Sequence, residues 1–261
     1  MSVISVVIPV YNDARMLRRC LSALADQSRP ADEIVVVDNA STDDSAAVAR
    51  EFGTRIVVEP RRGIASASAA GFDAAVGDLI VRLDADSVPD PGWLRHIEGR
   101  FSAHPVLDVA TGTADFVDTN RFTAWVARYV YLGWYFWAMG LLLGHPPMFG
   151  SNLALRASAW RAIRATAHRT SATVHDDLDL SFQVLPGMAV LYDEGMLMTV
   201  SGRPFDSALS FTIRCWRGVA TIAMNWSGWV PRRVAVTRAA QFAYDTDLQP
   251  PIARRSAASL P

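Results

Sequence analysis

Four short apolar runs alternate with helical patterns at the start of this chain, and that alternation limits the folds open to it more than any other feature. The expected strands are 3–9, 34–37, 55–58 and a fourth that begins at Leu79, and the expected helices between them are 14–25, 45–52 and 64–76. Strands and helices in alternation predict βαβ units and a parallel sheet. We therefore expect an α/β fold in which helices flank a mostly parallel central sheet.

The fourth run ends in a pair of acids, reading LIVRLDADS over residues 79–87. Open α/β sheets place ligand sites where strands end, which is where Asp84 and Asp86 would stand. Two like charges this close call for a positive partner, and a divalent cation carrying a diphosphate would meet that need. The spacing alone equally allows the two acids to cap the following helix or loop.

Two familiar nucleotide-binding patterns are missing. GxGxxG does not follow the first expected strand, and GxxxxGK[ST] does not occur in the chain. An Asp-x-Asp pair also marks haloacid dehalogenase phosphatases, but there it follows the first strand. Here it follows the fourth, which disfavours that class.

Composition narrows the class further. With 51% hydrophobic and 20% charged residues the chain is typical of a globular protein, and a net charge of -1 gives no sign of a nucleic-acid partner. All 25 basic residues are arginine, whose guanidinium suits a diphosphate. Cys20 and Cys215 lack metal-site spacing, and Met1–Pro9 lacks a basic signal region, so we expect a cytoplasmic protein.

Five motifs occur in order along about the first 220 residues: VVIPVYND at 6–13, VVVDNASTDDS at 35–45, GIASASAAGFDAAVGDLIVRLDADS at 63–87, FGSNLALR at 149–156 and HDDLDLSF at 175–182. Together they resemble the family 2 glycosyltransferases, which have the Rossmann-like GT-A fold. The resemblance implies a nucleoside-diphosphate sugar donor, a hydroxyl acceptor, Mn²⁺ or Mg²⁺, and inversion by single displacement. It also implies a place in cell-envelope glycan or glycolipid synthesis.

The resemblance implies a donor site at the ends of the first strands. Its nucleotide-binding set is Pro9, Tyr11, Asp13, Asp38, Arg62 and Asp84. Pro9 and Tyr11 would shape or stack on the base, and Asp38 would accept a hydrogen bond from the base N–H. Asp86 would bind the metal. From the residues alone, Tyr11 could instead line the core and Asp38 could be an N-cap.

The resemblance also implies an acceptor side in the second half of the chain. Gly150, Ser151 and Asn152 would form a loop that meets the acceptor sugar. Asp177 would be the general base, with its pKa raised by Asp176. These acids could also be favourable charges in the first turn of a helix. The candidates for a cationic clamp on the diphosphate are Arg203, Arg214 and Arg217.

The chain departs from the family pattern at two places. Gln183 stands where relatives often carry Arg, and residues 211–215 read FTIRC where processive members carry Gln-x-x-Arg-Trp. These differences favour transfer of a single sugar. The alternatives are a retaining GT-A enzyme and a non-catalytic nucleotide-sugar-binding scaffold, and the base, the sugar and the acceptor (saccharide, lipid or small metabolite) stay open.

Residues 122–149 are unusually apolar and aromatic, with Arg128 as their one Arg, Lys, Asp or Glu. The uncharged stretch 129–144 has 16 residues, short of the roughly 20 that span a bilayer. A buried helix, a homodimer interface and a peripheral helix at the cytoplasmic face of a membrane are all compatible, and core or dimer packing is favoured.

The chain divides at two shifts in composition. We expect a nucleotide-sugar-binding half over 1–118, an acceptor-binding and catalytic half over 119–245 with a helical apolar region, and a flexible tail over 246–261. The two halves would form one continuous domain.

Overall fold

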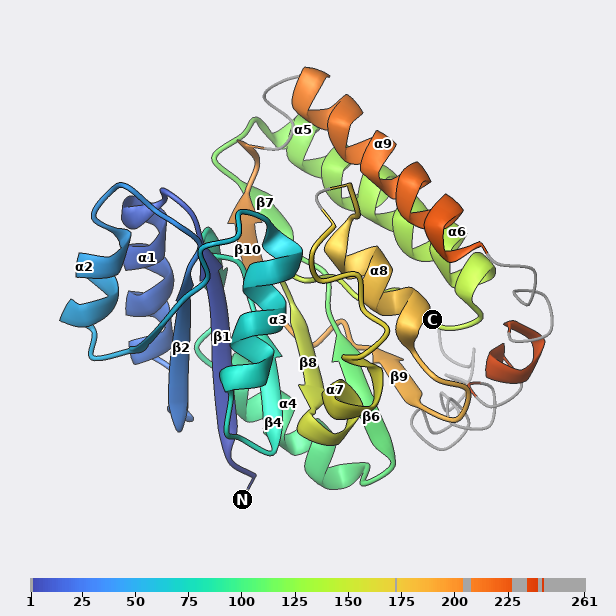
Figure 1. Cartoon of the computed structure of the whole chain (residues 1–261), viewed down its shortest axis with the longest axis horizontal. Helices are drawn as coiled ribbons and strands as arrows, with labels where there is room; N and C mark the ends of the chain where they lie inside the picture. Colours follow the sequence, from blue (N-terminus) through green and yellow to red (C-terminus); the bar gives the residue numbers. More distant parts are fainter. Residues whose placement is uncertain (1, 172, 204–207, 227–233, 239–240, 242–261) are drawn as a thin grey trace, which may run out of the picture.

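A seven-stranded sheet runs through the middle of the protein, with strand order β3-β2-β1-β4-β8-β6-β9 (Figure 1). The computed structural model describes residues 2–171, 173–203, 208–226, 234–238 and 241. The strands of this sheet are β1 (Ile4–Val10), β2 (Glu33–Asp38), β3 (Arg55–Val58), β4 (Leu79–Arg82), β6 (Leu107–Thr111), β8 (Leu153–Arg156) and β9 (Ala189–Tyr192). Among these seven, β8 alone is antiparallel to its neighbours, so the predicted mostly parallel sheet is confirmed.

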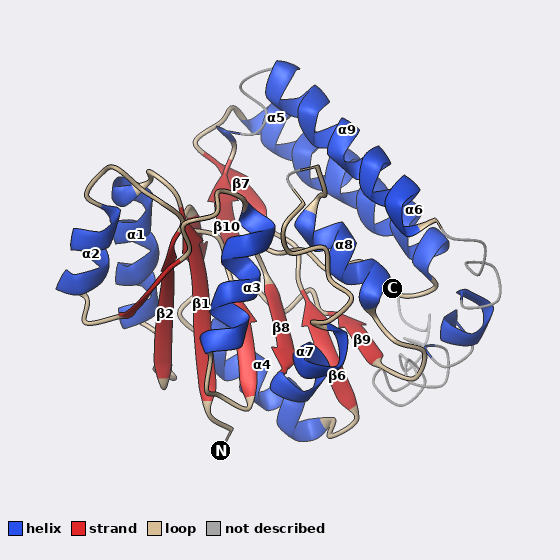
Figure 2. Cartoon of the chain, in the orientation of Figure 1, coloured by secondary structure: helices blue, strands red, loops and turns tan. Residues whose placement is uncertain are grey.

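Helices cover both faces of the sheet (Figure 2). They include α1 (Ala14–Ala25), α2 (Ser45–Glu51), α3 (Ile64–Ala74), α4 (Trp93–Ala103), α7 (Ala157–Ile163) and α8 (Asp176–Gln183). Side chains alternate along β1: Ile8 packs in a cluster with α1 and α4, and Val7 packs in a second cluster with α3, α7 and α8. The predicted first four strands and the helices between them are thus present.

Helix α3 lies very close to the sheet. A Cβ placed on Gly71 would come within 2.3 Å of Val7 and 2.8 Å of Val37, so glycine is needed at this contact. The small residues of this helix therefore serve packing, as their composition indicates.

A small second sheet, absent from the sequence-based expectation, forms beside the end of β4. It has strand order β5-β10-β7, from β5 (Ser87–Pro89), β10 (Met198–Ser201) and β7 (Asp115–Val117). Strand β5 starts directly after Asp86 and pairs with β10, which leads to Arg203. This pairing brings two candidate site residues together that lie far apart in the sequence.

The apolar region forms a helical run above the sheet in Figure 1, made of α5 (Arg121–Trp125), the π-helix η1 (Val126–Leu132) and α6 (Gly133–Leu143). Ala127, Leu132 and Leu143 are buried, whereas much of its aromatic surface is exposed, including Phe122, Trp125, Tyr129, Trp134 and Trp137. The expectation of a buried helix is therefore wrong for this outer surface. The run is apolar on all sides, so its sequence did not show which face would pack.

The last described long helix, α9 (Ala208–Asn225), packs against α8. Within the part of the chain that the structure describes, every helix is too short or too polar to cross a bilayer. Strands from both halves expected at 1–118 and 119–245 share the central sheet, while that division itself stays a prediction. The tail expected at 246–261 lies outside the described residues.

Candidate active site

A pocket of about 400 Å³ opens where β1 and β4 end. Eleven of the predicted site residues line it: Pro9, Tyr11, Asp13, Asp84, Asp86, Ser151, Asp176, Asp177, Arg203, Arg214 and Arg217. They come from both halves of the sequence. The fold therefore brings together most of the residues that the motifs single out.

The two acids after β4 have different partners. Asp84 accepts hydrogen bonds from Arg82 Nη2 (3.1 Å) and from Ser151 Oγ (2.5 Å). Asp86 accepts one from Arg203 Nη2 at 3.0 Å. Burial, and then the charge of Asp84, raise the pKa of Asp86 above its ordinary value, although Arg203 opposes this. A further positive charge at Asp86 would thus be stabilised.

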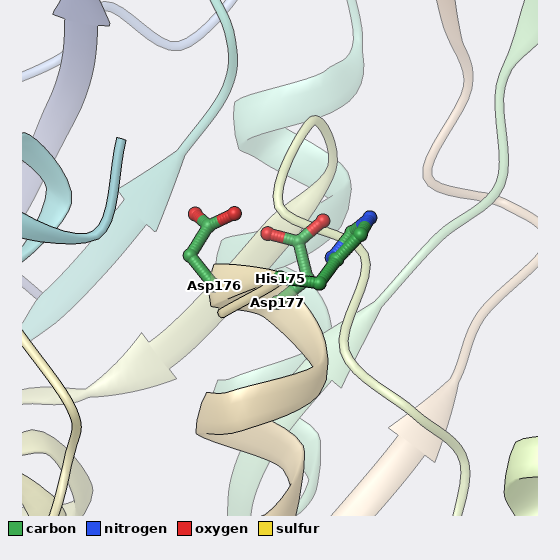
Figure 3. Close-up of side chains that lie close together, drawn as sticks. All are labelled: His175, Asp176 and Asp177. Atoms are coloured by element: carbon green, nitrogen blue, oxygen red, sulfur yellow. The ribbon is translucent and has the colours of Figure 1, made fainter. Parts of the chain in front are cut away.

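The second acidic pair stands in the first turn of α8, with both carboxylates pointing out from the helix end (Figure 3). Arg82 Nη1 donates to Asp176 at 2.6 Å and to Asp177 at 3.1 Å. Burial alone would raise the pKa of Asp176, but Arg82, His175 and hydrogen bonds together outweigh it and the pKa is lowered. Burial, and then the charge of Asp176, raise the pKa of Asp177 to about 8. One acid is thus held ionised and its neighbour close to its titration point.

His175 precedes this pair and faces the same pocket. Among the described atoms, its Nδ1 is buried without a hydrogen-bond partner, and burial lowers its pKa. Its ligand atoms and those of Asp176 and Asp177 lie within 4.8 Å of one another, close enough to share a metal ion. However, the guanidinium of Arg82 already donates hydrogen bonds to both of these carboxylates.

At the donor end, Tyr11 is partly exposed and its ring lies under Arg62, whose Cζ is 3.2 Å from the ring centroid. Arg62 therefore reaches the pocket only through Tyr11. Asp38 is not in the pocket lining, and its Oδ1 accepts a hydrogen bond from Ser41 N at 2.9 Å. This contact stabilises a turn. The N-cap that the sequence left open for Asp38 is not what forms, because α2 begins at Ser45 with Asp44 at its N-cap.

The predicted acceptor loop contributes one of its three residues to the pocket, Ser151. Asn152 is fully buried; it accepts from Trp93 Nε1 and donates to the carbonyls of Thr113 and Met196. Its side chain is therefore directed into the core and does not line the pocket. Gly150 also lies outside the lining, but its backbone packs closely against the side chains of Asp177 and Arg82.

Helix α9 and the π-helix close the acceptor side. Arg214 hydrogen-bonds the Tyr131 hydroxyl, and Arg217 lies on the next turn of α9. Within the described residues, neither arginine pairs with a carboxylate, unlike Arg203, which bridges Asp13 and Asp86. The three predicted clamp residues thus line the same pocket, Arg203 beside Asp86 and the other two on α9.

Sequence reasoning missed some pocket residues, and Arg82 is the most important. Its signal was a single charge inside an otherwise apolar strand. The acids that follow the strand were expected to have a metal ion as their positive partner. Tyr131 and Tyr135 were also missed as site residues, because aromatic residues in an apolar segment give no sign of which ones face a pocket. His175 was missed although it begins the fifth motif.

A model of family 2 glycosyl transferases matches residues 5–171. This is more than half of the chain, and the chain therefore belongs to glycosyl transferase family 2, a class of transferase enzymes. The resemblance seen in the motifs is thereby confirmed.

Particular relatives match just under half of the chain. It is 33% identical over 129 residues to glycosyltransferase AglE of Haloferax volcanii, which covers 46% of this chain and 42% of that protein. It is 37% identical over 139 residues to the undecaprenyl-phosphate 4-deoxy-4-formamido-L-arabinose transferase of Sodalis glossinidius, over 48% of this chain and 40% of the relative. The chain matches less than half the length of these two curated relatives.

Solved structures confirm the GT-A fold. The mannosyltransferase PcManGT from Pyrobaculum calidifontis, in complex with GDP-Man and Mn²⁺, superposes with a TM-score of 0.66 at 19% identity, over 100% of this chain and 77% of the other. The Mycobacterium tuberculosis glucosyl-3-phosphoglycerate synthase, in complex with Mn²⁺, UDP and phosphoglyceric acid, gives 0.60 at 20% identity, over 86% and 78%.

Proposed function

We propose that this protein transfers a single sugar from a nucleoside-diphosphate sugar to an acceptor hydroxyl, with inversion at the anomeric carbon. The observation that carries the proposal is that the Asp84–Asp86 pair and Asp177 open onto one pocket. One pair of acids suits a metal–diphosphate group, and the other suits a proton acceptor. The GDP-Man and UDP in the two solved structures support a donor of this class.

In this proposal the donor binds at the ends of β1 and β4. Pro9 and Tyr11 give the base an apolar edge and an aromatic face, with Arg62 fixing the Tyr11 ring from the other side. Asp38 would accept a hydrogen bond from the base N–H with its other carboxylate oxygen, Oδ2. The base is uracil, guanine or thymine.

The residues around Asp86 fit a divalent cation. Carboxylate oxygens of Asp13 and Asp86 converge on the same nitrogen of Arg203, at 2.5 and 3.0 Å. Hard carboxylate oxygens at one point are the donor set that Mn²⁺ and Mg²⁺ prefer. Asp86, with Asp13 or Asp84 beside it, would hold the ion. When bound, the metal neutralises charge on the departing nucleoside diphosphate.

Asp177 acts on the acceptor. It takes the proton of the acceptor hydroxyl as that oxygen bonds to the anomeric carbon, while the bond from this carbon to the diphosphate oxygen breaks and the diphosphate keeps the electron pair. A base with a pKa near 8 is close to the optimum for proton transfer at neutral pH. Ser151, Arg214 and Arg217 line the space left for the acceptor, whether saccharide, lipid or small metabolite.

The donor site is tested by thermal melting with UDP, GDP and dTDP, each with and without Mn²⁺. A ligand that binds only the folded protein raises its Tm. The proposal predicts a rise with one nucleotide that depends on Mn²⁺. The absence of a shift with all three would contradict the proposed donor site.

The exposed aromatic surface of α5, η1 and α6 has two candidate occupants in this proposal, namely the cytoplasmic face of a membrane and a second copy of the chain. Trp and Tyr suit both kinds of contact. Flotation with anionic vesicles tests the first and analytical ultracentrifugation tests the second. Trp134→Ser, outside the pocket and 64% exposed, should weaken whichever contact is present.

A further inference from the structure

The strand that leads to the acidic pair contains one buried charge. Arg82 is 1% exposed and stands between Val81 and Leu83, both with no exposed surface. A guanidinium in such a place is kept only where carboxylates compensate it, since an unpaired buried charge is very unfavourable. Its partners therefore indicate what it does.

Arg82 contacts three carboxylates from two distant parts of the sequence. Its Nη2 donates to Asp84 at 3.1 Å, and its Nη1 donates to Asp176 at 2.6 Å and to Asp177 at 3.1 Å. The planar fork of arginine makes such multiple contacts in fixed directions, which the single ammonium of lysine does not. The side chain thus ties the donor end of the pocket to the first turn of α8.

The packing around this contact leaves it little freedom. A Cβ added to Gly150 would lie 2.1 Å from Asp177 Oδ1 and 2.5 Å from Arg82 Nη1. The backbone of the 149–152 turn therefore presses directly on the ion pair. Ser151, the next residue, holds the other oxygen of Asp84.

We propose that Arg82 is a positioning residue for the transfer step: it fixes the Asp177 carboxylate relative to Asp84 and the donor behind it. The inference rests on the proposed function, in which Asp177 is the base. It also gives Asp176 and Asp177 a positive partner from within the protein. In this proposal the Arg82 guanidinium is the positive partner of Asp176 and Asp177, and the divalent metal ion binds at Asp86.

The test compares Arg82→Met and Arg82→Lys with Arg100→Met, which removes an arginine from Asp193 outside the pocket. Turnover is followed as nucleoside diphosphate released from UDP-glucose, GDP-mannose or dTDP-glucose. For R82M we expect kcat about 100-fold lower, since a misplaced catalytic group costs that much, with donor Kd little changed. R82K should fall between, and R100M should match the wild type.

A pH profile separates positioning from general loss of structure. Without the neighbouring positive charge, the acid limb of kcat in R82M should move to higher pH. If R82M fails to fold, the double variant R82M/D176N removes one charge of each sign. It should then show an acid limb near that of the wild type while kcat stays low, because the Asp177 carboxylate is no longer held.

The outcomes distinguish this inference from the proposed function. Wild-type kcat and an unmoved pH limb in R82M, together with inactive Asp177→Asn, would overturn the role of Arg82 alone. Normal turnover in Asp177→Asn would overturn the base assignment itself.

Discussion

The guanidinium of Arg203 lies 3.0 Å from Asp86, the residue to which we assign the metal. It also lies 2.5 Å from Asp13. A cation is therefore already held where the metal and the diphosphate would bind. Asp13 and Asp86 would hold the metal, and Arg203 would then be available to pair with the diphosphate, which is its predicted clamp role.

Replacing Arg203 by Ala should therefore affect the metal and the nucleotide in opposite directions. The Kd of the nucleoside diphosphate with Mn²⁺ should rise about tenfold, since one hydrogen bond to a charged group is lost. Mn²⁺ alone should bind more tightly, because its competitor at Asp86 is gone. Isothermal titration measures both. Arg18→Ala, which breaks an exposed pair with Glu51, is the control; equal weakening of both ligands by R203A would contradict the account.

Gly150→Ala should damage the site without adding any polar group. The new methyl would collide with Asp177 and Arg82, and overpacking of this kind costs about 1–3 kcal/mol. We expect a lower Tm and strongly reduced turnover. Gly99→Ala is the matched control, because nothing lies within 4 Å of its Cβ in helix α4, and it should be neutral or slightly stabilising. Wild-type activity in G150A would show that the contact is not required.

Asp177→Asn should abolish most turnover and leave the donor in place. Loss of a general base costs about 10²–10⁴-fold, whereas the nucleotide end of the pocket is untouched. In the wild-type protein, kcat/KM should rise with pH to a plateau above about 8, because Asp177 must be deprotonated in the free enzyme. A flat profile, with D177N fully active, would favour a retaining mechanism.

The same carboxyl should make stability depend on pH. Its unfolded pKa is about 3.9 and its folded pKa is raised to about 8, so between these values the native state binds the extra proton. The contribution of this group to stability then falls as pH rises, by about 1.4 kcal/mol per pH unit in this window. The amide side chain introduced in D177N does not titrate, so the Tm of D177N relative to that of the wild type should increase as the pH rises from about 5 to about 8. Parallel Tm curves for the two proteins would show that the raised pKa is absent.

Much of the fold could be predicted from the sequence because local patterns carry it. The apolar runs that became β1, β2 and β4 are buried whichever partners they meet, and Asp84, Asp86 and Asp177 stand in motifs whose order is specific. The order of β8, β6 and β9 depends on long-range pairing, to which no local pattern points.

The features that the sequence did not predict have physical causes as well. Asn152 was expected at a sugar, but its amide makes three hydrogen bonds in the core. Two of the three carboxylate partners of Arg82, Asp176 and Asp177, lie more than ninety positions away. The sequence therefore showed the charge but not these two partners. The aromatic residues of 122–149 have no preferred face, and only packing decides which are exposed.

The most direct test of the central claim compares Asp86→Asn with Asp177→Asn in the same two assays. These are Mn²⁺-dependent nucleotide binding by calorimetry and release of nucleoside diphosphate from the matching donor. We predict that D86N loses the metal-dependent part of binding, while D177N binds like the wild type and fails to turn over. If D86N binds nucleotide and Mn²⁺ normally, or if D177N turns over like the wild type, the assignment of the two acidic pairs is contradicted.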